Sequence, residues 1–300
     1  MKTREEKIFQ LIGNIIMWVA ALMAIIPLIL LLSSSFTDNN ALIKYGYRFI
    51  PTVFSTEAYS YVFSTGNAVL QAYFVSFLLT FVGTICSLII TTMLAYPLAR
   101  QGMPFRGALT FIVFFTMLFN GGLVPTYINY TNVFHIKDTF WAILIPSLLM
   151  NAYNVLLTKS YFVTGVPTEI LEASAIDGAS EFKTFLSIAL PMAKPIIATI
   201  GMFVGIAYWN DWNNGIIYLS NTNGKQWYSI QSLLYQMMNN IQFLAQNAQN
   251  LSNAQEGLAS IPSASVRMAM AVMGVLPVVI VYPFIQNNFV KGITLGGVKG

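Results

Sequence analysis

The sequence predicts an all-α, polytopic membrane protein with six transmembrane helices. Three observations lead to this fold class: 56% of the 300 residues are hydrophobic, only 9% are charged, and six apolar segments are long enough to cross a bilayer. Soluble domains carry about 25% charged residues. So few charges cannot cover the water-exposed surface of a chain of this length, and lipid must therefore solvate much of it.

Each predicted span follows from its length, because crossing the hydrocarbon core takes about 20 mostly apolar residues. The six spans are residues 8–32, 69–98, 108–128, 139–162, 195–219 and 263–286. The first is longer than the roughly 7–15 apolar residues of a signal peptide, and no small-x-small cleavage site follows it. We therefore expect it to be a retained helix.

These spans divide the chain into three parts. Residues 1–68 hold an N-terminal tail, the first helix and an extracellular loop. Residues 69–286 hold the other five helices, with a polar loop at 163–194 and an extracellular loop at 220–262 that contains one amphipathic helix around residues 227–243. The latter loop is either a flexible connector or a surface that touches a ligand or an outside protein. Residues 287–300 form a C-terminal tail.

Lysine and arginine set the expected orientation, because they concentrate in cytoplasmic loops near the span ends. With the N-terminus inside, ten basic residues fall on the inner side: Lys2, Arg4, Lys7, Arg100, Arg106, Lys159, Lys183, Lys194, Lys291 and Lys299. Five fall outside: Lys44, Arg48, Lys137, Lys225 and Arg267. Both termini and the 163–194 loop are therefore expected in the cytoplasm of a multi-pass cell-membrane protein.

The 163–194 loop is too polar to cross the membrane, but its residues predict a helical structure. Its charged residues are Glu169, Glu172, Asp177, Glu181, Lys183 and Lys194. Pro167 fits the first turn of a short helix, Thr164 or Thr168 could cap it, and Gly178 ends it. A water-facing helical patch of this kind in a multi-span protein often docks a partner.

A second short helix is expected after Gly178. It runs toward Leu190-Pro191, which ends it, and Pro195 opens the next span. The loop is therefore predicted to consist of two short helices that lie on the cytoplasmic face of the membrane.

One spacing in this loop resembles a family motif. Glu172-Ala173-Ser174 is followed after three residues by Gly178, and after nine more by Ile188, one residue and Leu190-Pro191. This order resembles the EAA motif of the permease subunits of ATP-binding cassette (ABC) importers, with Ser174 where the family usually has a second alanine. Further segments resemble carbohydrate permeases related to lipoprotein-associated and aldouronate oligosaccharide systems: residues 117–126, 209–212, 282–286 and 289–300.

The resemblance implies the fold of a type I ABC importer transmembrane domain and a set of partners. These are a second homologous permease, two nucleotide-binding ATPase subunits, an extracellular solute-binding lipoprotein and a sugar. The residues implied to dock the ATPase are Glu172, Ala173, Ser174, Asp177, Gly178, Ile188, Leu190 and Pro191. The chain has no Gly-x-x-x-x-Gly-Lys-Ser/Thr phosphate loop, so ATP and Mg²⁺ are expected on the partner subunits, and this chain is expected to hold no cofactor or catalytic residue.

Polar residues inside the spans are candidates for the substrate pathway, since they are costly in a membrane and usually face an interior. The candidates are Asn120, Asn151, Asn154, Trp209, Asn210, Asp211 and Trp212. Aromatic rings and amide or carboxylate groups suit the C–H faces and hydroxyls of sugars. The alternative is packing between helices, with the tryptophans at the membrane interface.

Other functional classes find less support. The basic residues are scattered singly, which argues against nucleic-acid binding. Cys86 and His135 are the single cysteine and histidine, so an internal disulfide and a metal site built on these residue types are not expected. An ion-coupled secondary transporter is the main alternative, but the span centres are nearly free of ionisable groups. For a membrane enzyme, no catalytic constellation is found.

Overall fold

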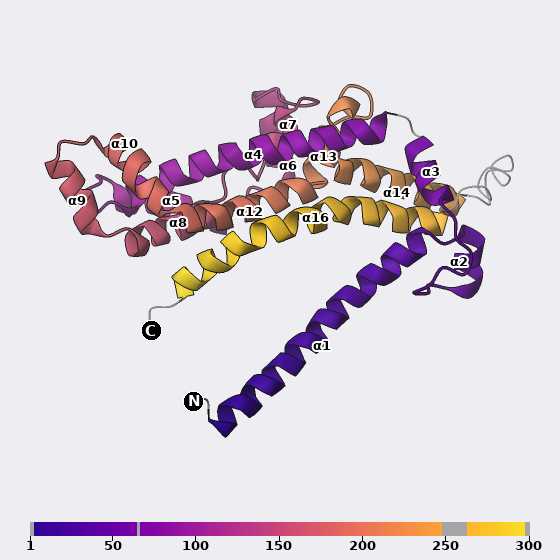
Figure 1. Cartoon of the computed structure of the whole chain (residues 1–300). Helices are drawn as coiled ribbons and strands as arrows, with labels where there is room; N and C mark the ends of the chain where they lie inside the picture. Colours follow the sequence, from indigo (N-terminus) through magenta and orange to yellow (C-terminus); the bar gives the residue numbers. More distant parts are fainter. Residues whose placement is uncertain (1–2, 65–66, 248–262, 298–300) are drawn as a thin grey trace. The chain divides into compact units, whose positions relative to one another are not determined.

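The computed structural model describes residues 3–64, 67–247 and 263–297 (Figure 1). Within these ranges the chain is helical, and the one β pairing is an isolated bridge between Thr37 and Phe54. The α-helices are α1 Arg4–Ser35, α2 Asn39–Tyr45, α3 Glu57–Ser64, α4 Ala68–Ala99, α5 Arg106–Leu118, α6 Leu123–Ile128, α7 Trp141–Leu144, α8 Ala152–Gly165, α9 Thr168–Ile176, α10 Glu181–Thr184, α11 Leu190–Met192, α12 Lys194–Asn210, α13 Asn213–Tyr218, α14 Ile230–Asn247 and α16 Ser263–Gly297. Two π-helical turns, η1 Asn129–Val133 and η2 Phe185–Ala189, and the 3₁₀ turn η3 Lys225–Trp227 complete the set. The all-α prediction is confirmed.

The chain divides into two compact units, Met1–Val69 with Gln236–Pro277 and Leu70–Tyr235 with Val278–Gly300. In the first unit, α1 begins with a capping box in which the Thr3 side chain accepts from the Glu6 N–H and the Glu6 carboxylate accepts from the Thr3 N–H.

The segment after α1, expected only as a loop, is folded. The Phe36 ring stacks on Phe54 with centroids 5.7 Å apart and lies 4.9 Å from Tyr59. The Tyr59 hydroxyl is hydrogen-bonded to Ser35 at 2.8 Å. Helices α2 and α3 were missed by the sequence analysis, although Asp38, which caps α2, is a typical helix-start residue.

Three helices are long and apolar enough to cross a membrane unaided among the described residues: α1, α4 and α16. They correspond to the first, second and sixth predicted spans. Two further spans are possible as bent pairs, Arg106–Leu118 with Leu123–Val133 at 114°, and Glu181–Met192 with Lys194–Asn210 at 80°. The third, fourth and fifth predicted spans differ from these three, because each of these segments is broken.

The breaks have identifiable local causes. The third span breaks before Gly122, whose φ of 85° is open to glycine and costly for other residues. The fourth, expected at 139–162, is split into α7 and α8 by a stretch that contains Pro146 and Ser147, the latter at φ 66°; proline lacks the N–H that a helix needs. The fifth breaks at Asp211, between α12 and α13.

The core of the second unit lies among α4, α8 and α12. Leu79 and Leu98 of α4, Val155 of α8, and Ile200 and Tyr208 of α12 are almost completely buried. These helices supply the rigid frame on which the segments between them are placed.

Helices α4 and α12 approach closely at a glycine. A methyl group on Gly83 would lie 2.5 Å from ring carbons of Tyr208, which is closer than atoms can pack. The Tyr208 hydroxyl in turn donates to the Leu144 carbonyl at 2.9 Å, where α7 ends. Small residues let membrane helices approach in this way.

The predicted extracellular segment at 220–262 is partly described. The expected amphipathic helix is α14, which begins at Ile230 and buries Leu234 and Ile241 on one face; residues 248–262 lie outside the described residues. Helix α16 extends beyond the predicted sixth span, so the expected C-terminal tail is helical as far as Gly297.

We predict that Gly83→Ala destabilises the chain. The added methyl must displace Tyr208 and its bond to Leu144, and overpacking of this kind costs about 1–3 kcal/mol. Thermal unfolding of the purified chain in detergent checks this. Gly13→Ala in α1 is the matched control, because nothing lies within 4 Å of that position; an equal loss of stability in both variants would contradict the proposed close contact.

Candidate functional site

The residues of the loop motif lie in one compact segment, residues 168–192, which we call the motif segment (Figure 1). Its first helix, α9, starts at Thr168. Pro167 occupies the N-cap in an extended conformation with φ −60° and makes no side-chain cap bond. The expectation that Thr164 or Thr168 caps this helix is therefore wrong, because proline itself stops the helix from extending further toward the N-terminus.

The end of α9 explains the glycine of the motif. Gly178 has a φ of 76°, its N–H donates to Ala175 O at 3.1 Å, and the Ala179 N–H donates to Ser174 O at 3.0 Å. These two bonds make a Schellman motif, in which the residue after the C-cap takes the left-handed conformation and glycine is strongly preferred. The predicted break at Gly178 is confirmed.

The second limb of the motif segment is one continuous helical stretch. Ser180 caps α10 by accepting from the Lys183 N–H at 3.3 Å, and α10 continues through the π turn η2 into α11. Pro191 does not end this helix, contrary to expectation. We attribute the wide turn η2 to Pro191, whose ring would clash with the carbonyl four residues earlier in a regular helix.

The direction of the chain changes instead after Met192. The helical stretch Glu181–Met192 meets Lys194–Asn210 at 80°, and Pro195 lies in the first turn of α12, as predicted. The motif segment therefore forms an angular attachment at one end of α12.

The eight predicted docking residues divide between two faces. Glu172, Ala173, Asp177, Gly178 and Pro191 are exposed. Ser174, Ile188 and Leu190 point inward: Ser174 is 6% exposed, and the other two are half-buried against the core. The sequence spacing thus combines an outward surface with an inward anchor.

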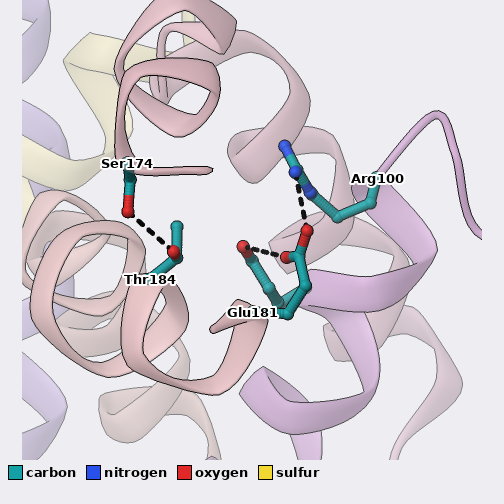
Figure 2. Close-up of polar contacts among 5 residues, drawn as sticks. Arg100, Ser174, Glu181 and Thr184 are labelled. Carbon is teal, nitrogen blue, oxygen red and sulfur yellow. Dashed lines mark hydrogen bonds and ion pairs between the residues drawn. The ribbon is translucent and has the colours of Figure 1, made fainter. Parts of the chain in front are cut away.

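The anchor includes one buried hydrogen bond between the two limbs. The Ser174 and Thr184 hydroxyls are 2.8 Å apart, and both residues are buried (Figure 2). Ser174, noted in the sequence as a substitution for alanine, therefore joins α9 to α10 and does not extend the outward surface.

A second polar contact fixes the motif segment to α4. Arg100 donates to one oxygen of Glu181 at 2.8 Å, and the Tyr96 hydroxyl donates to the other at 3.0 Å (Figure 2). We call these three residues the brace. The sequence analysis placed Arg100 and Glu181 in neighbouring loops on one side of the membrane, but it did not pair them, because 81 residues separate them.

Arg100 and Glu181 of the brace are both charged at neutral pH. The hydrogen bond between Arg100 and Glu181 lowers the pKa of the glutamate and raises the pKa of the arginine. Because the folded-state pKa of Glu181 lies below its unfolded value, its stabilising contribution is complete above the unfolded pKa and is lost as the pH falls through the folded pKa.

A cavity of about 470 Å³ adjoins the brace. Its lining is mostly apolar, with the brace residues as the polar groups; it includes Met93, Pro97, Met103, Pro104, Phe182 and Phe185. The cavity therefore lies between the end of α4 and α10.

Two of the predicted pathway residues occupy helix breaks. The Asn120 carboxamide oxygen accepts from the Gly122 N–H at 2.8 Å, where α5 and α6 are interrupted. Asn151 is the N-cap of α8 and accepts from the Asn154 N–H at 3.2 Å, while Asn154 itself is buried. Backbone groups freed by a break must be satisfied internally in a membrane, and these side chains do so.

Asp211 acts in the same way at the third break. One of its oxygens accepts from the N–H groups of Asn213 and Asn214 at 3.1 and 3.2 Å, and its carbonyl accepts from Ser229 at 3.0 Å. The Asn214 side chain donates to the Pro146 carbonyl at 3.0 Å. This network favours the packing interpretation of Asp211, and its role in a substrate pathway stays a prediction.

The remaining pathway candidates differ in exposure. Trp209 is 5% exposed and packs on Phe77, with centroids 5.2 Å apart. Trp212 stacks on Tyr235 at 4.5 Å and is 42% exposed, and Asn210 is exposed. Within residues 209–212, Trp212 and Asn210 are thus the exposed members, Asp211 is half-buried and Trp209 is buried.

Comparison with known proteins gives consistent results. The family described as "Binding-protein-dependent transport system inner membrane component" matches residues 105–295. Among curated proteins of Bacillus subtilis (strain 168), the "Polygalacturonan/rhamnogalacturonan transport system permease protein YtcP" is 35% identical over 93% of this chain and 94% of its own length. "Protein LplC" is 33% identical over 99% and 97% of the two chains.

A solved structure is also similar. It is a bacterial ABC transporter involved in the import of the acidic polysaccharide alginate, and one of its chains superposes with a TM-score of 0.79 at 27% identity, covering 96% of this chain and 99% of that one. The type I importer architecture expected from the motif is thus supported over nearly the whole chain.

We predict that the bond between Ser174 and Thr184 stabilises the motif segment. Ser174→Ala or Thr184→Val alone leaves a buried hydroxyl without its partner, at a cost of about 1–3 kcal/mol, whereas removing both hydroxyls is expected to cost less than either single change. A double-mutant cycle on thermal unfolding measures the coupling. Strictly additive effects would show that the two hydroxyls do not depend on each other.

Proposed function

Because this chain belongs to the family of binding-protein-dependent transport system inner membrane components, we propose that it forms half of the membrane pathway of an ABC importer for oligosaccharides. The observation that carries this proposal is the family match over residues 105–295, which contains the whole motif segment. Relatives that cover nearly the full chain are carbohydrate permeases by name, which supports the carbohydrate class.

The motif segment is proposed to dock an ATPase subunit. Glu172 lies on the exposed face of α9, where its charge is available to a basic residue of a partner. Ala173 and Gly178 are small and exposed, so a partner surface can approach closely. The rigid turn at Gly178 and the buried bond of Ser174 hold this face in one conformation, and preorganisation of this kind lowers the cost of binding.

The remaining partners follow from this assignment. A second, homologous permease completes the pathway, two ATPase subunits bind ATP and Mg²⁺, and an extracellular solute-binding lipoprotein delivers the sugar. The motif segment and both termini then lie in the cytoplasm, consistent with the excess of lysine and arginine on that side of the predicted spans.

The substrate is proposed to be an oligosaccharide of the kind released from a polysaccharide. One relative is named for polygalacturonan and rhamnogalacturonan, another for arabino-oligosaccharides, and the similar structure imports alginate. Acidic and neutral sugars are both represented, so the experiment below includes one of each.

The alternative of an ion-coupled secondary transporter is not favoured. Asp211, the carboxylate in the predicted fifth span, caps a helix break. The family match and the carbohydrate permeases among the relatives also point to ATP-driven import.

We predict that Glu172→Lys and Gly178→Pro each reduce co-purification of the ATPase with this chain by about tenfold or more, since an interface charge reversal or a disrupted turn removes a central contact. Glu172→Lys reverses the exposed charge. In Gly178→Pro, the proline cannot adopt the positive φ that this position has. Pull-down of the co-expressed ATPase from detergent extracts measures the effect.

Glu57→Lys in α3 is the control for this charge reversal, because Glu57 is exposed and lies outside the motif segment. Its pull-down is expected to match that of the unaltered chain. Normal ATPase recovery with Glu172→Lys and Gly178→Pro would refute docking at the motif segment.

We also predict that the purified chain alone hydrolyses no ATP, because it lacks a phosphate loop. Proteoliposomes with the complete complex and the binding protein are expected to accumulate a labelled oligosaccharide only when ATP is enclosed on the ATPase side. Oligogalacturonate and arabino-oligosaccharide are the two probes. ATP hydrolysis by this chain alone, or uptake driven by an ion gradient without ATP, would contradict the proposal.

A further inference from the structure

The brace joins the motif segment to the longest rigid element of the second unit. We propose that Tyr96 and Arg100 are positioning residues that make α4 follow the motif segment, so that movement imposed on the segment by the ATPase reaches the far end of α4. This inference rests on the proposed function and extends it, because the family motif lies entirely in residues 172–191 and includes neither residue.

Tyr96 is the centre of the attachment. Its hydroxyl donates to Glu181, and its ring lies 5.1 Å from Phe185 of η2 and 5.7 Å from Phe162 of α8. All three rings are buried. One side chain of α4 therefore contacts both the second limb of the motif segment and the helix that leads into the first limb.

Arg100 adds a directional, charged contact. It lies in the turn after α4 and donates to the Glu181 oxygen that does not accept from Tyr96. Two donors from one helix end on a single carboxylate fix the orientation of α10 more strictly than one bond would, since each hydrogen bond has its own preferred direction.

The outward face is linked to this contact through the buried bond between the limbs. Glu172 and Ser174 belong to the same short helix, Ser174 bonds to Thr184, and Thr184 lies on α10 three residues after Glu181. A displacement of the exposed face of α9 is thereby passed to α10, and from α10 through the brace to α4 (Figure 2).

Helix α4 carries the displacement to its other end. It has 32 residues, which corresponds to about 48 Å at the α-helical rise. Near its start, Gln71 donates to the Gln226 carbonyl at 3.0 Å and Ser76 accepts from the Ile230 N–H at 2.8 Å. These contacts connect α4 to the beginning of α14, and Ser229 connects that region to Asp211 at the break after α12.

The brace is suited to transmit movement without being needed for folding. The Glu181 side chain is 65% exposed and that of Arg100 24%, so water reaches the pair from the glutamate side, and an ion pair that water can reach contributes little to stability. Loss of the brace is therefore expected to leave the chain folded and the outward face of α9 available to the ATPase, while the mechanical connection to α4 is weakened.

The experiment uses the complete importer complex in proteoliposomes and measures sugar uptake and ATP hydrolysis in the same preparation. Arg100→Glu and Glu181→Arg are each expected to lower the ratio of uptake to hydrolysis by about tenfold, the usual scale of a coupling between two sites. ATPase pull-down is expected to be unchanged in Arg100→Glu, because Arg100 lies outside the motif segment. The double variant Arg100→Glu/Glu181→Arg restores the ion pair in reverse and is expected to recover most of the ratio.

Two further variants separate the brace from general effects. Tyr96→Phe keeps the ring packing and removes only the hydroxyl, and a smaller loss of the ratio is expected. Lys7→Glu makes the same change of charge as Arg100→Glu at an exposed residue of α1, and no loss is expected. An unchanged ratio in both single charge variants, or a double variant no better than the singles, would overturn the proposal.

A distance measurement tests the brace independently of the substrate. Spin labels are attached at Glu169→Cys in α9 and Phe74→Cys in α4, on a Cys86→Ser background. In the complex, the distance between the two labels is expected to be the same with and without ATP and vanadate. In Arg100→Glu the separation is expected to change on ATP binding, and equal behaviour of the two chains would refute the brace. If unaltered complexes take up neither tested oligosaccharide, the proposed substrate class fails, and this distance comparison, which needs no sugar, still decides the inference.

Discussion

The structure depends on one constraint: a helix break frees backbone N–H and C=O groups, and in a membrane these groups need hydrogen-bond partners within the protein. Each of the three breaks in the second unit is closed by a side chain of its own. Asn120, Asn151 and Asp211 accept from the N–H groups that follow the breaks, and Tyr208 and Asn214 donate to carbonyls at the end of α7 and just beyond it. The helices can bend where they do because these partners are present.

This constraint changes the meaning of a polar residue inside a span. The sequence analysis selected such residues as candidates for sugar contact because a polar side chain is costly in a membrane. In the structure, three of the seven candidates bond to the backbone. A separate packing contact sets α12 against α4, at the point where Gly83 faces Tyr208. A close helix contact and satisfied breaks give the core a fixed arrangement. The motif segment is attached to this arrangement through α10 and the bend before α12.

Local features were predictable where the chemistry involves neighbours in the chain. The break at Gly178 and the place of Pro195 in the first turn of α12 follow from the residues themselves, because glycine and proline act on their own backbone. The end of the second limb was misplaced at Pro191, because a π turn absorbs the proline without stopping the helix. The pairing of Arg100 with Glu181 could not be predicted, since a sequence does not state which of several loop charges come together.

The sequence by itself determined that the chain is helical and lipid-solvated, where its apolar segments lie, and that residues 172–191 carry the spacing of a family motif. These properties depend on composition and on spacing along one helix. The tertiary structure alone decided that the motif has an exposed face with Glu172 and a buried anchor with Ser174, that polar span residues close the breaks, and that Glu181 ties the motif segment to α4. Each of these depends on which side chains meet across helices. Tertiary packing decides this, through contacts between residues up to 85 positions apart.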